Sequence, residues 1–501
     1  MKTKKMRWLI GVLVALAMVA ASCGGNDDDA EAPATEAPAT EAPATEAPVA
    51  AEPEPEPEAP EPETEEAAPA EPAPVLEDAP EEEEPEFQPA PTEEPEPEIP
   101  LTATWRGVTA DTITIGVTYL DFEQLVELGF SPATWGDQEL VIQLLVDDIN
   151  QRGGINGRRL EVIMDKYSPI GSTEAEAACL RITEDNEVFA VLFGFLGPAE
   201  VANTCIVDQQ ETILVGGTIT EERLAVARAP WVNERVTREV STGALFTLLD
   251  AEGMLEGRSV AVVADLPAAP QLEDVANLLR GRGVEPALEI ATSSQVADLI
   301  AQNQEWAALS ERIRSAGADT LLLVGNASAG IENARLNGLE VDIWATDASG
   351  LGSNIGNNVN PESARGVITV GAMTNAQIFE TDPRFKECLD VFNAKHPDIE
   401  IKHPDTLEEG EPLWFAALSA HCRFFQLFEL LVTAAGPNLT HETFAEAIAN
   451  IGEFSIAGQP YASLGPDKLS SNDSFQLLEQ DPDLGSRGQL VPIGPMRDAT
   501  P

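Results

Sequence analysis

The 501-residue sequence is poor in basic, aromatic and metal-binding side chains. It holds 29 lysine and arginine residues against 86 aspartate and glutamate residues, a formal net charge of −57, and it has only 3 tyrosines and 4 histidines. Binding to nucleic acid needs clustered basic residues that neutralise phosphates, so this composition argues against a nucleic-acid partner. An acidic balance of this size favours solubility and does not identify a ligand.

Motifs that mark nucleotide binding, hydrolysis or metal coordination are also missing from the sequence. No G-x-x-x-x-G-K-[ST] or G-x-G-x-x-G loop opens a helix, and there is no G-x-S-x-G nucleophile elbow. The histidines are scattered without an H-E-x-x-H spacing, and no C-x-x-C pair occurs. We therefore predict no cofactor, no metal site and no catalytic activity. A carboxylate pair for glycoside hydrolysis is the enzymatic alternative.

One hydrophobic run stands at the start of the chain. Residues 8–21 are apolar, four lysine and arginine residues precede them, and Ala20-Ala21-Ser22 leads into Cys23. This order is typical of an export signal that ends at a lipidated cysteine. We predict a lipoprotein signal peptide over residues 1–22 and a lipid on Cys23 that anchors an extracytoplasmic protein to the cell membrane. Ordinary cleavage with Cys23 incidental is the alternative, and no later run is expected to span a membrane.

Residues 23–104 form a low-complexity segment. Residues 24–100 hold 27 aspartate and glutamate residues and no lysine or arginine, and the unit Glu-Ala-Pro-Ala-Thr recurs every five residues from Glu31. Large apolar side chains are nearly absent, so no core can form. Proline and like-charge repulsion favour a disordered, extended tether that reaches at most about 250 Å. We interpret it as a spacer that carries the folded part away from the membrane through a thick wall.

From Trp105 onward, short apolar strands alternate with helices. Period-two alternation predicts a strand over residues 113–119, and apolar residues at helical spacing predict a helix over residues 140–149. The alternation continues to about residue 215, with a helix over residues 201–210, and begins again near residue 238. This pattern is typical of parallel sheets covered on both faces. We therefore predict an α/β protein with two doubly wound parallel-sheet lobes, preceded by the disordered tether.

Four cysteines remain besides the lipidated one, which is an even number in an exported chain and predicts two disulfides. Three pairings are possible. Proximity in the sequence favours Cys179–Cys205 and Cys388–Cys422, each between two neighbouring predicted helices.

Several motifs resemble the type I periplasmic binding proteins, in particular the receptors for branched-chain amino acids (Leu/Ile/Val). Trp135-Gly136-Asp137 is followed by D-I-N-Q-R-G-G-I-N-G-R at residues 148–158, and residues 318–325 and 344–347 are similar to strand ends in the second lobe of that family. The resemblance covers residues 113–464 and implies two lobes joined by a three-stranded hinge that close over one ligand. It places lobe I at residues 105–236 and 372–447, and lobe II at residues 237–371 and 448–501.

The resemblance also implies a receptor that captures a small polar molecule and delivers it to an ABC permease and its ATPase. Ligands of open parallel sheets lie beyond the carboxyl ends of the strands. Helix amino termini there offer free N–H groups to a carboxylate. The candidate ligand-binding residues in these loops are Tyr119, Trp135, Phe195, Leu196, Gly197, Gly217, Thr218, Thr220, Asp265, Asn326 and Asp347.

Three of these assignments have alternatives. Trp135 would line the pocket or cover the core. Thr218 and Thr220 compete for the position of the family's carboxylate-binding threonine. Asp347 would hold a ligand ammonium group, as in amino-acid binders of the family, or cap a helix.

Two departures from the family pattern widen the ligand class. Residues 194–198 read G-F-L-G-P where amino-acid binders tend to have serines, and residues 265–270 read D-L-P-A-A-P where the family often has Tyr-Gly. Only backbone N–H groups would then bind a carboxylate near residues 194–198. We expect an amino acid, or instead an amide, urea or a small acid. The alternatives to transport are a sensor for a signalling partner, an extracytoplasmic enzyme on the same scaffold, and a spacer lipoprotein with a vestigial cleft.

Overall fold

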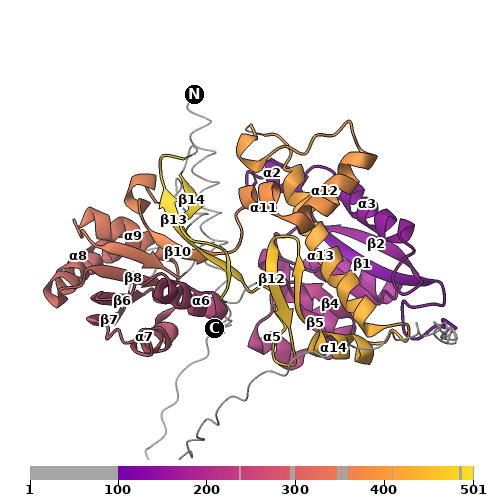
Figure 1. Cartoon of the computed structure of the whole chain (residues 1–501), viewed down its shortest axis with the longest axis horizontal. Helices are drawn as coiled ribbons and strands as arrows, with labels where there is room; N and C mark the ends of the chain where they lie inside the picture. Colours follow the sequence, from indigo (N-terminus) through magenta and orange to yellow (C-terminus); the bar gives the residue numbers. More distant parts are fainter. Residues whose placement is uncertain are drawn as a thin grey trace, which may run out of the picture. The chain divides into compact units, whose positions relative to one another are not determined.

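The computed structural model describes residues 100–131, 133–235, 238–293, 299–346, 351, 359–408, 410–484 and 488–499. The predicted signal peptide, Cys23, the tether before residue 100 and Asp347 lie outside the described residues. The folded part is an α/β protein built on two mainly parallel sheets, as the sequence predicts (Figure 1).

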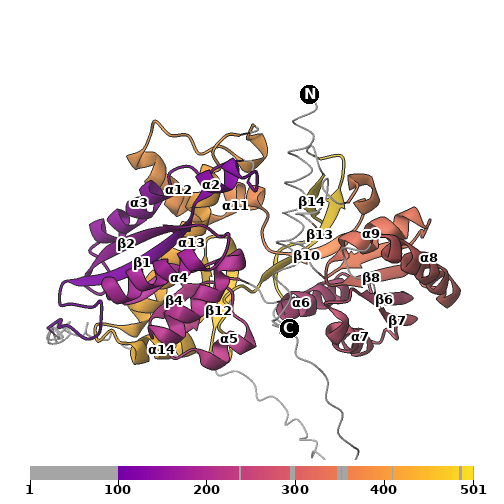
Figure 2. The same cartoon turned by 180° about the vertical axis from the view of Figure 1, so that it is seen from behind.

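The first sheet has parallel strands in the order β2-β1-β3-β4-β5. Val117, Thr118 and Tyr119 of β1 point to alternate faces and are all buried, because helices cover both faces of the sheet. Helix α13 crosses one face (Figure 1), and α4 lies over the opposite face (Figure 2). The strands are β1 (Thr112–Leu120), β2 (Arg159–Tyr167), β3 (Ala190–Phe193), β4 (Ile213–Gly216) and β5 (Trp231–Val232).

The helices of the first lobe come from two distant parts of the chain. The first set is α2 (Phe122–Glu127), α3 (Gln138–Gln151), α4 (Thr173–Leu180) and α5 (Glu221–Val226). The second set is α11 (Asn375–Thr381), α12 (Pro383–Lys395), α13 (Trp414–Ala435) and α14 (His441–Asn450).

The helix predicted over residues 201–210 is present, but most of it is not α-helical. A 3-10 segment, Gly197–Ala202, and a π-helical turn, Cys205–Gln209, account for most of it. Pro198 lies in the first turn of the 3-10 segment, and Cys205 at the start of the π-helical turn is bonded to Cys179 of α4. Residues 203 and 204 are α-helical and connect the two parts, so the segment is helical from residue 197 to residue 209.

The second sheet has the strand order β14-β13-β10-β9-β8-β6-β7, with β13 and β14 antiparallel to their neighbours and β15 (Arg497–Asp498) paired to β13. One hydrophobic cluster joins it to α6 (Arg238–Ala251) and α7 (Leu272–Arg280), and another joins it to α8 (Leu299–Ala316) and α9 (Ala327–Leu336). The strands are β6 (Val260–Ala264), β7 (Leu288–Ala291), β8 (Thr320–Val324), β9 (Asp342–Ala345), β10 (Ile368–Gly371), β13 (Ser474–Asp481) and β14 (Gln489–Pro492).

The strands after α14 are an addition to what the sequence predicts. β11 (Gly452–Ile456) and β12 (Gln459–Leu464) form an antiparallel hairpin. Ile456, Ala457 and Leu464 belong to the same hydrophobic core as the first sheet. We therefore propose that lobe I extends to about residue 464, beyond the boundary at residue 447 expected from the sequence.

Within the described residues, the chain passes between the two sheets three times, after β5, after β10 and after β12. The Asn233 N–H donates to the Leu469 carbonyl (3.0 Å), and the Ser471 N–H donates to the Asn233 carbonyl (2.9 Å). The Gln476 side-chain amide donates to the carbonyl of Ala372 on the second passage (3.0 Å). These contacts tie the three passages into the hinge.

Both expected disulfides are present. Cys179–Cys205 joins α4 to the π-helical turn, and Cys388–Cys422 joins α12 to α13. Among the described residues, α13 is the one helix long and apolar enough to cross a membrane by length and composition. Because 67% of its apolar stretch is buried and it packs on β3 and β4, we assign it to the core of lobe I.

Candidate ligand-binding site

The carboxyl ends of both sets of parallel strands lie next to the hinge. The first passage leaves from the carboxyl end of β5, and the second leaves from the carboxyl end of β10. Parallel strands share one carboxyl edge. The loops after β1, β3 and β4 therefore lie on the hinge side of the first sheet, and the loops after β6, β8 and β9 on the hinge side of the second. This is the edge at which open α/β sheets bind ligands.

Tyr119 lies near the end of β1 and is 5% exposed. Its hydroxyl donates a hydrogen bond to the Glu139 carboxylate of α3. Burial, and next the Glu139 carboxylate, raise the pKa of the Tyr119 phenol, so this group stays neutral. Tyr119 therefore links β1 to α3 and already uses its donor inside the protein.

The loop after β3 is held by Asn203, a fully buried side chain. The Phe195 N–H donates to Asn203 Oδ1 (2.8 Å), and Asn203 Nδ2 donates to the Phe195 carbonyl (3.0 Å). Gly217 has φ +66°, and a Cβ there would come within 2.8 Å of Asn203 Nδ2. Only glycine at this position leaves room for the Asn203 amide group. Asn203 thus brings the β3 and β4 loops together.

The side chain and backbone groups of the β3 loop already have partners within the protein. The Phe195 side chain is fully buried and stacks edge to face on Tyr167 (4.9 Å between centroids), so it packs in the core and does not line an accessible surface. The Leu196 N–H donates to the Tyr167 hydroxyl (3.0 Å), and the Gly217 N–H donates to the Phe193 carbonyl (2.9 Å). A carboxylate would have to displace these bonds. Gly197 is exposed at the start of the 3-10 segment.

The loop after β4 separates the two threonine candidates. Thr220 caps α5, because its hydroxyl accepts the Arg223 N–H (3.3 Å). The Thr218 carbonyl accepts from the Arg223 guanidinium (3.1 Å), which also pairs with Glu200 (2.9 Å). Arg223 is therefore a cation at this edge that the sequence reasoning missed. Thr218 is the better candidate for a ligand contact, since the Thr220 hydroxyl already has a structural role.

Trp135 stands apart from these loops. It is half-buried and stacks on Phe122 of α2, with 4.6 Å between ring centroids. Both interpretations of this side chain, pocket wall and core cover, are compatible with the stacked pair.

Lobe II brings two predicted residues together. Asp265 follows β6, and its carboxylate accepts the Ala268 N–H (2.8 Å) and the Asn326 N–H (2.9 Å). Asn326 follows β8 and caps α9 through the Ser328 N–H (3.1 Å). A cavity of about 40 Å³ lies here, lined by Val263, Asp265, Leu266, Thr292, Gln302, Glu305, Trp306, Leu323, Val324, Asn326, Ala329 and Gly330. This space holds about one water molecule.

The hinge contributes charged residues that the sequence reasoning also missed. Asn233-Glu234-Arg235 follows the buried strand β5. Glu234 is 7% exposed, and its Oε2 has no hydrogen-bond partner among the described residues, while its Oε1 lies 3.6 Å from the exposed Arg235 guanidinium. A polar triplet directly after an apolar strand was the available signal. A buried carboxylate with one unsatisfied oxygen in a hinge is a candidate for contact with a polar ligand.

Comparisons with known proteins agree on the fold. The sequence matches no protein-family model and no curated protein. A putative branched-chain amino acid ABC transporter protein from Rhodospirillum rubrum is similar in structure (TM-score 0.51, 13% identity), over 77% of this chain and 99% of that one. An ABC transporter substrate-binding protein from Desulfitobacterium hafniense in complex with Leu (TM-score 0.50, 15% identity) matches over 76% and 100%. A type 1 periplasmic binding protein from Bordetella pertussis Tohama I gives the same four values. The chain has the type I periplasmic binding fold.

Proposed function

We propose that this protein is an extracytoplasmic receptor that captures a small polar molecule between its lobes and delivers it to an ABC importer. The observation that carries the proposal is the hinge. Three hydrogen-bonded passages join two doubly wound sheets at the carboxyl edges of their strands. Such a connection lets the lobes rotate about a few residues and enclose a ligand. An enzyme of this size would instead need a catalytic constellation, and its motifs are missing from the sequence.

The ligand class follows from the polar groups at the two edges. Lobe I offers Thr218 and the Arg223–Glu200 pair, the hinge offers Glu234, and lobe II offers Asp265 and Asn326. Mixed hydrogen-bonding groups of this kind suit a small zwitterion, amide or acid. The Desulfitobacterium hafniense neighbour is a complex with Leu. An amino acid is therefore the first class to test, with amides and small acids second.

The amino-terminal residues support membrane attachment and transport. The basic residues, the apolar run and Cys23 are typical of a lipoprotein signal, and the acidic, proline-rich segment after it favours a spacer. We propose that lipid on Cys23 holds the protein at the membrane and that the closed lobes dock on a permease served by an ATPase. Mass spectrometry of the mature amino terminus tests the first part, since a free Cys23 thiol would contradict it.

A melting-temperature screen tests the receptor proposal directly. The protein, freed of carried-over ligand, is heated with amino acids, amides, urea, polyamines, small acids and sugars. A ligand at a thousand times its Kd adds about 4 kcal/mol. At about 2.1 cal/mol/K per residue of unfolding entropy, this raises the Tm of about 400 residues by about 5 °C. A rise confined to one chemical class identifies the substrate. No rise with any compound would contradict the receptor proposal and favour a vestigial cleft.

A further inference from the structure

A second concave surface lies mainly on lobe I. It is a cavity of about 890 Å³ between α3, α12, α13 and the β11–β12 hairpin, and Asp473 and Asp498, beside and in the paired strands β13 and β15 of the second sheet, also line it. Helix α3 begins after the carboxyl end of β1 and returns to the amino end of β2. Its last turns, which hold Leu145, Ile149 and Arg152 of the cavity wall, therefore lie toward the edge opposite the candidate ligand site. We call this space the lobe I groove.

The floor of the lobe I groove is apolar. Leu145 and Ile149 of α3 and Phe425 of α13 line it and are at most 6% exposed. The Cys388–Cys422 disulfide lies among these side chains and locks α12 to α13. The hairpin adds the 43% exposed Tyr461, which lies on the same face of the hairpin as Glu453. A polar solute would gain little on such a floor, whereas an apolar or aromatic group would bury surface there.

The charged side chains of the groove are mostly acidic. Six carboxylates line it, those of Asp148, Glu387, Glu429, Glu453, Asp473 and Asp498, together with the guanidinium groups of Arg152 and Arg384. Asp473 already pairs with Lys468 (2.8 Å). Without Asp473 and Asp498, the other four carboxylates still outnumber the two guanidinium groups.

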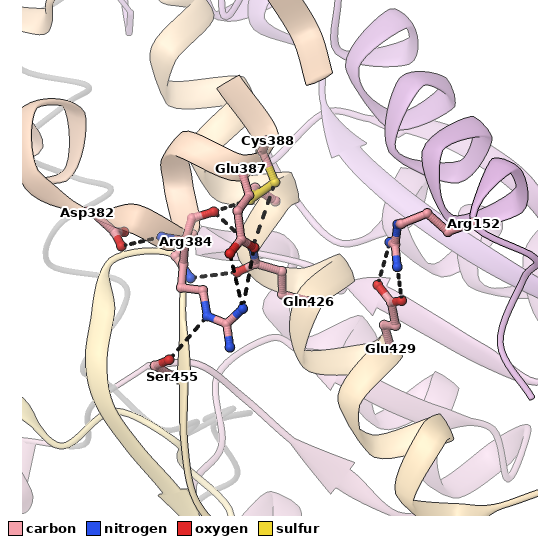
Figure 3. Close-up of polar contacts among 10 residues, drawn as sticks. Arg152, Asp382, Arg384, Glu387, Cys388, Gln426, Glu429 and Ser455 are labelled. Atoms are coloured by element: carbon pink, nitrogen blue, oxygen red, sulfur yellow. Dashed lines mark hydrogen bonds and ion pairs between the residues drawn. A yellow bond between two sulfur atoms is a disulfide. The ribbon is translucent and has the colours of Figure 1, made fainter. Parts of the chain in front are cut away.

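Both guanidinium groups already contact carboxylates (Figure 3). Arg152 forms a bidentate pair with Glu429 (2.6 and 2.9 Å) and also contacts Asp148 (2.9 Å). Arg384 contacts Glu387 (3.3 Å) and the Ser455 hydroxyl (3.2 Å). A ligand carboxylate would therefore meet excess negative charge and engaged cations, which disfavours anions.

We propose that the lobe I groove binds an amphipathic organic cation, an ammonium group carried on an aromatic or aliphatic body. The body lies on the apolar floor, and the ammonium group lies at the acidic rim near Glu453 and Tyr461, where carboxylate attraction and the aromatic face act together. The volume is within the range of small-molecule sites. Binding in this groove requires no ligand between the lobes.

Three probes with one ring system and different charges test the proposal. The binding of 1-naphthylmethylammonium, 1-naphthylmethanol and 1-naphthylacetate to the full mature chain is measured by naphthalene fluorescence or calorimetry. We expect the ammonium probe to have a Kd at least about tenfold lower than the alcohol, with the acetate weakest, because only the cation complements the rim. Equal affinities for all three, or no binding of the cation, would overturn the proposal.

Variants locate the probe. Val391→Trp on α12 and Thr433→Trp on α13 each place an indole ring in the groove and should abolish cation binding. Because Thr433 is exposed, the Thr433→Trp variant should fold even if the Val391→Trp variant does not. Leu336→Trp on α9, a 70% exposed residue of lobe II, is the matched control and should bind normally. Glu453→Gln should raise the Kd for the cation several-fold and leave the alcohol unchanged. Full cation binding by both groove variants would place the probe elsewhere and contradict the assignment.

Discussion

The carboxyl edges of the two lobes are built differently although both follow the same doubly wound plan. In lobe I, the side chains of Asn203 and Tyr167 form hydrogen bonds with backbone groups of the β3 loop, which fix the conformation of that edge. In lobe II, the Asp265 carboxylate bridges two loops beside a small cavity. The comparison shows that each edge is held by one side chain that hydrogen-bonds the backbone of its loops, a neutral amide in lobe I and a carboxylate in lobe II.

The largest expected effect comes from Asn203→Ala. It removes both hydrogen bonds to Phe195 and leaves buried backbone groups without partners, at about 1–3 kcal/mol each. We expect a loss of about 3 kcal/mol in unfolding free energy and a Tm lower by about 4 °C, measured by calorimetry. Asn277→Ala, on the exposed side of α7, is the control and should change Tm by less than about 1 °C. Equal effects would show that the lobe I edge does not depend on Asn203.

The second prediction separates the lobes by pH. All four histidines lie in helices or loops of lobe I, and burial lowers the pKa of His421 to about 3. His421 lies 5.5 Å from the Phe193 ring, and neither ring nitrogen has a hydrogen-bond partner among the described residues. The pKa of His421 in the folded protein lies below its value of about 6.5 in the unfolded chain. The contribution of neutral His421 to the free energy of unfolding is therefore complete above about pH 6.5 and is lost progressively as the pH falls toward 3.

His421→Phe tests this pH dependence. The variant should gain about 2 kcal/mol relative to the wild type between pH 7.5 and pH 5, measured by urea unfolding, because the unfolded state no longer gains the proton. Hydrogen exchange in the wild type should speed up first in β3 of lobe I and later in β8 of lobe II as the pH falls. Simultaneous acceleration in both strands would contradict a difference between the lobes.

The third prediction concerns the bridge in lobe II. Asp265→Ala removes the acceptor of the Ala268 and Asn326 N–H groups and should cost about 1–2 kcal/mol of unfolding free energy. It should also weaken the stabilisation by the ligand found in the screen, unlike Asp274→Ala on an exposed face of α7. If ligand stabilisation survives in Asp265→Ala, this carboxylate serves only the loops.

The smallest effect separates the two threonines of lobe I. Thr220→Ala should cost about 1 kcal/mol through the lost cap of α5 and leave the Kd of the ligand unchanged. Thr218→Ala should leave stability within about 0.5 kcal/mol and raise the ligand Kd. Calorimetric unfolding and titration of both variants measure the two quantities, and the reverse pattern would assign the ligand contact to Thr220.

Much of the fold was predictable from local patterns. Residues 113–119 alternate as a strand and form most of β1, and residues 140–149 lie within α3. Both periods could be recognised because each is displayed within a single segment of the chain. Sequence proximity was enough for Cys179–Cys205 and Cys388–Cys422, since each pair lies on neighbouring helices. The site was less predictable. Asp265 and Asn326 do meet, but Phe195 is in the core, and Arg223 and Glu234 carried no motif.

The sequence by itself determined the alternation of strands and helices, the restart of that alternation near residue 238 and the disulfide pairs, because these depend on residues close together in the chain. The tertiary structure alone decided that the β11–β12 hairpin packs on lobe I and that α3, α12 and α13 enclose the lobe I groove. These features depend on contacts between segments far apart in sequence, such as Arg152 with Glu429. Such contacts leave no periodic signal in the chain, because their geometry is set only when the distant segments pack.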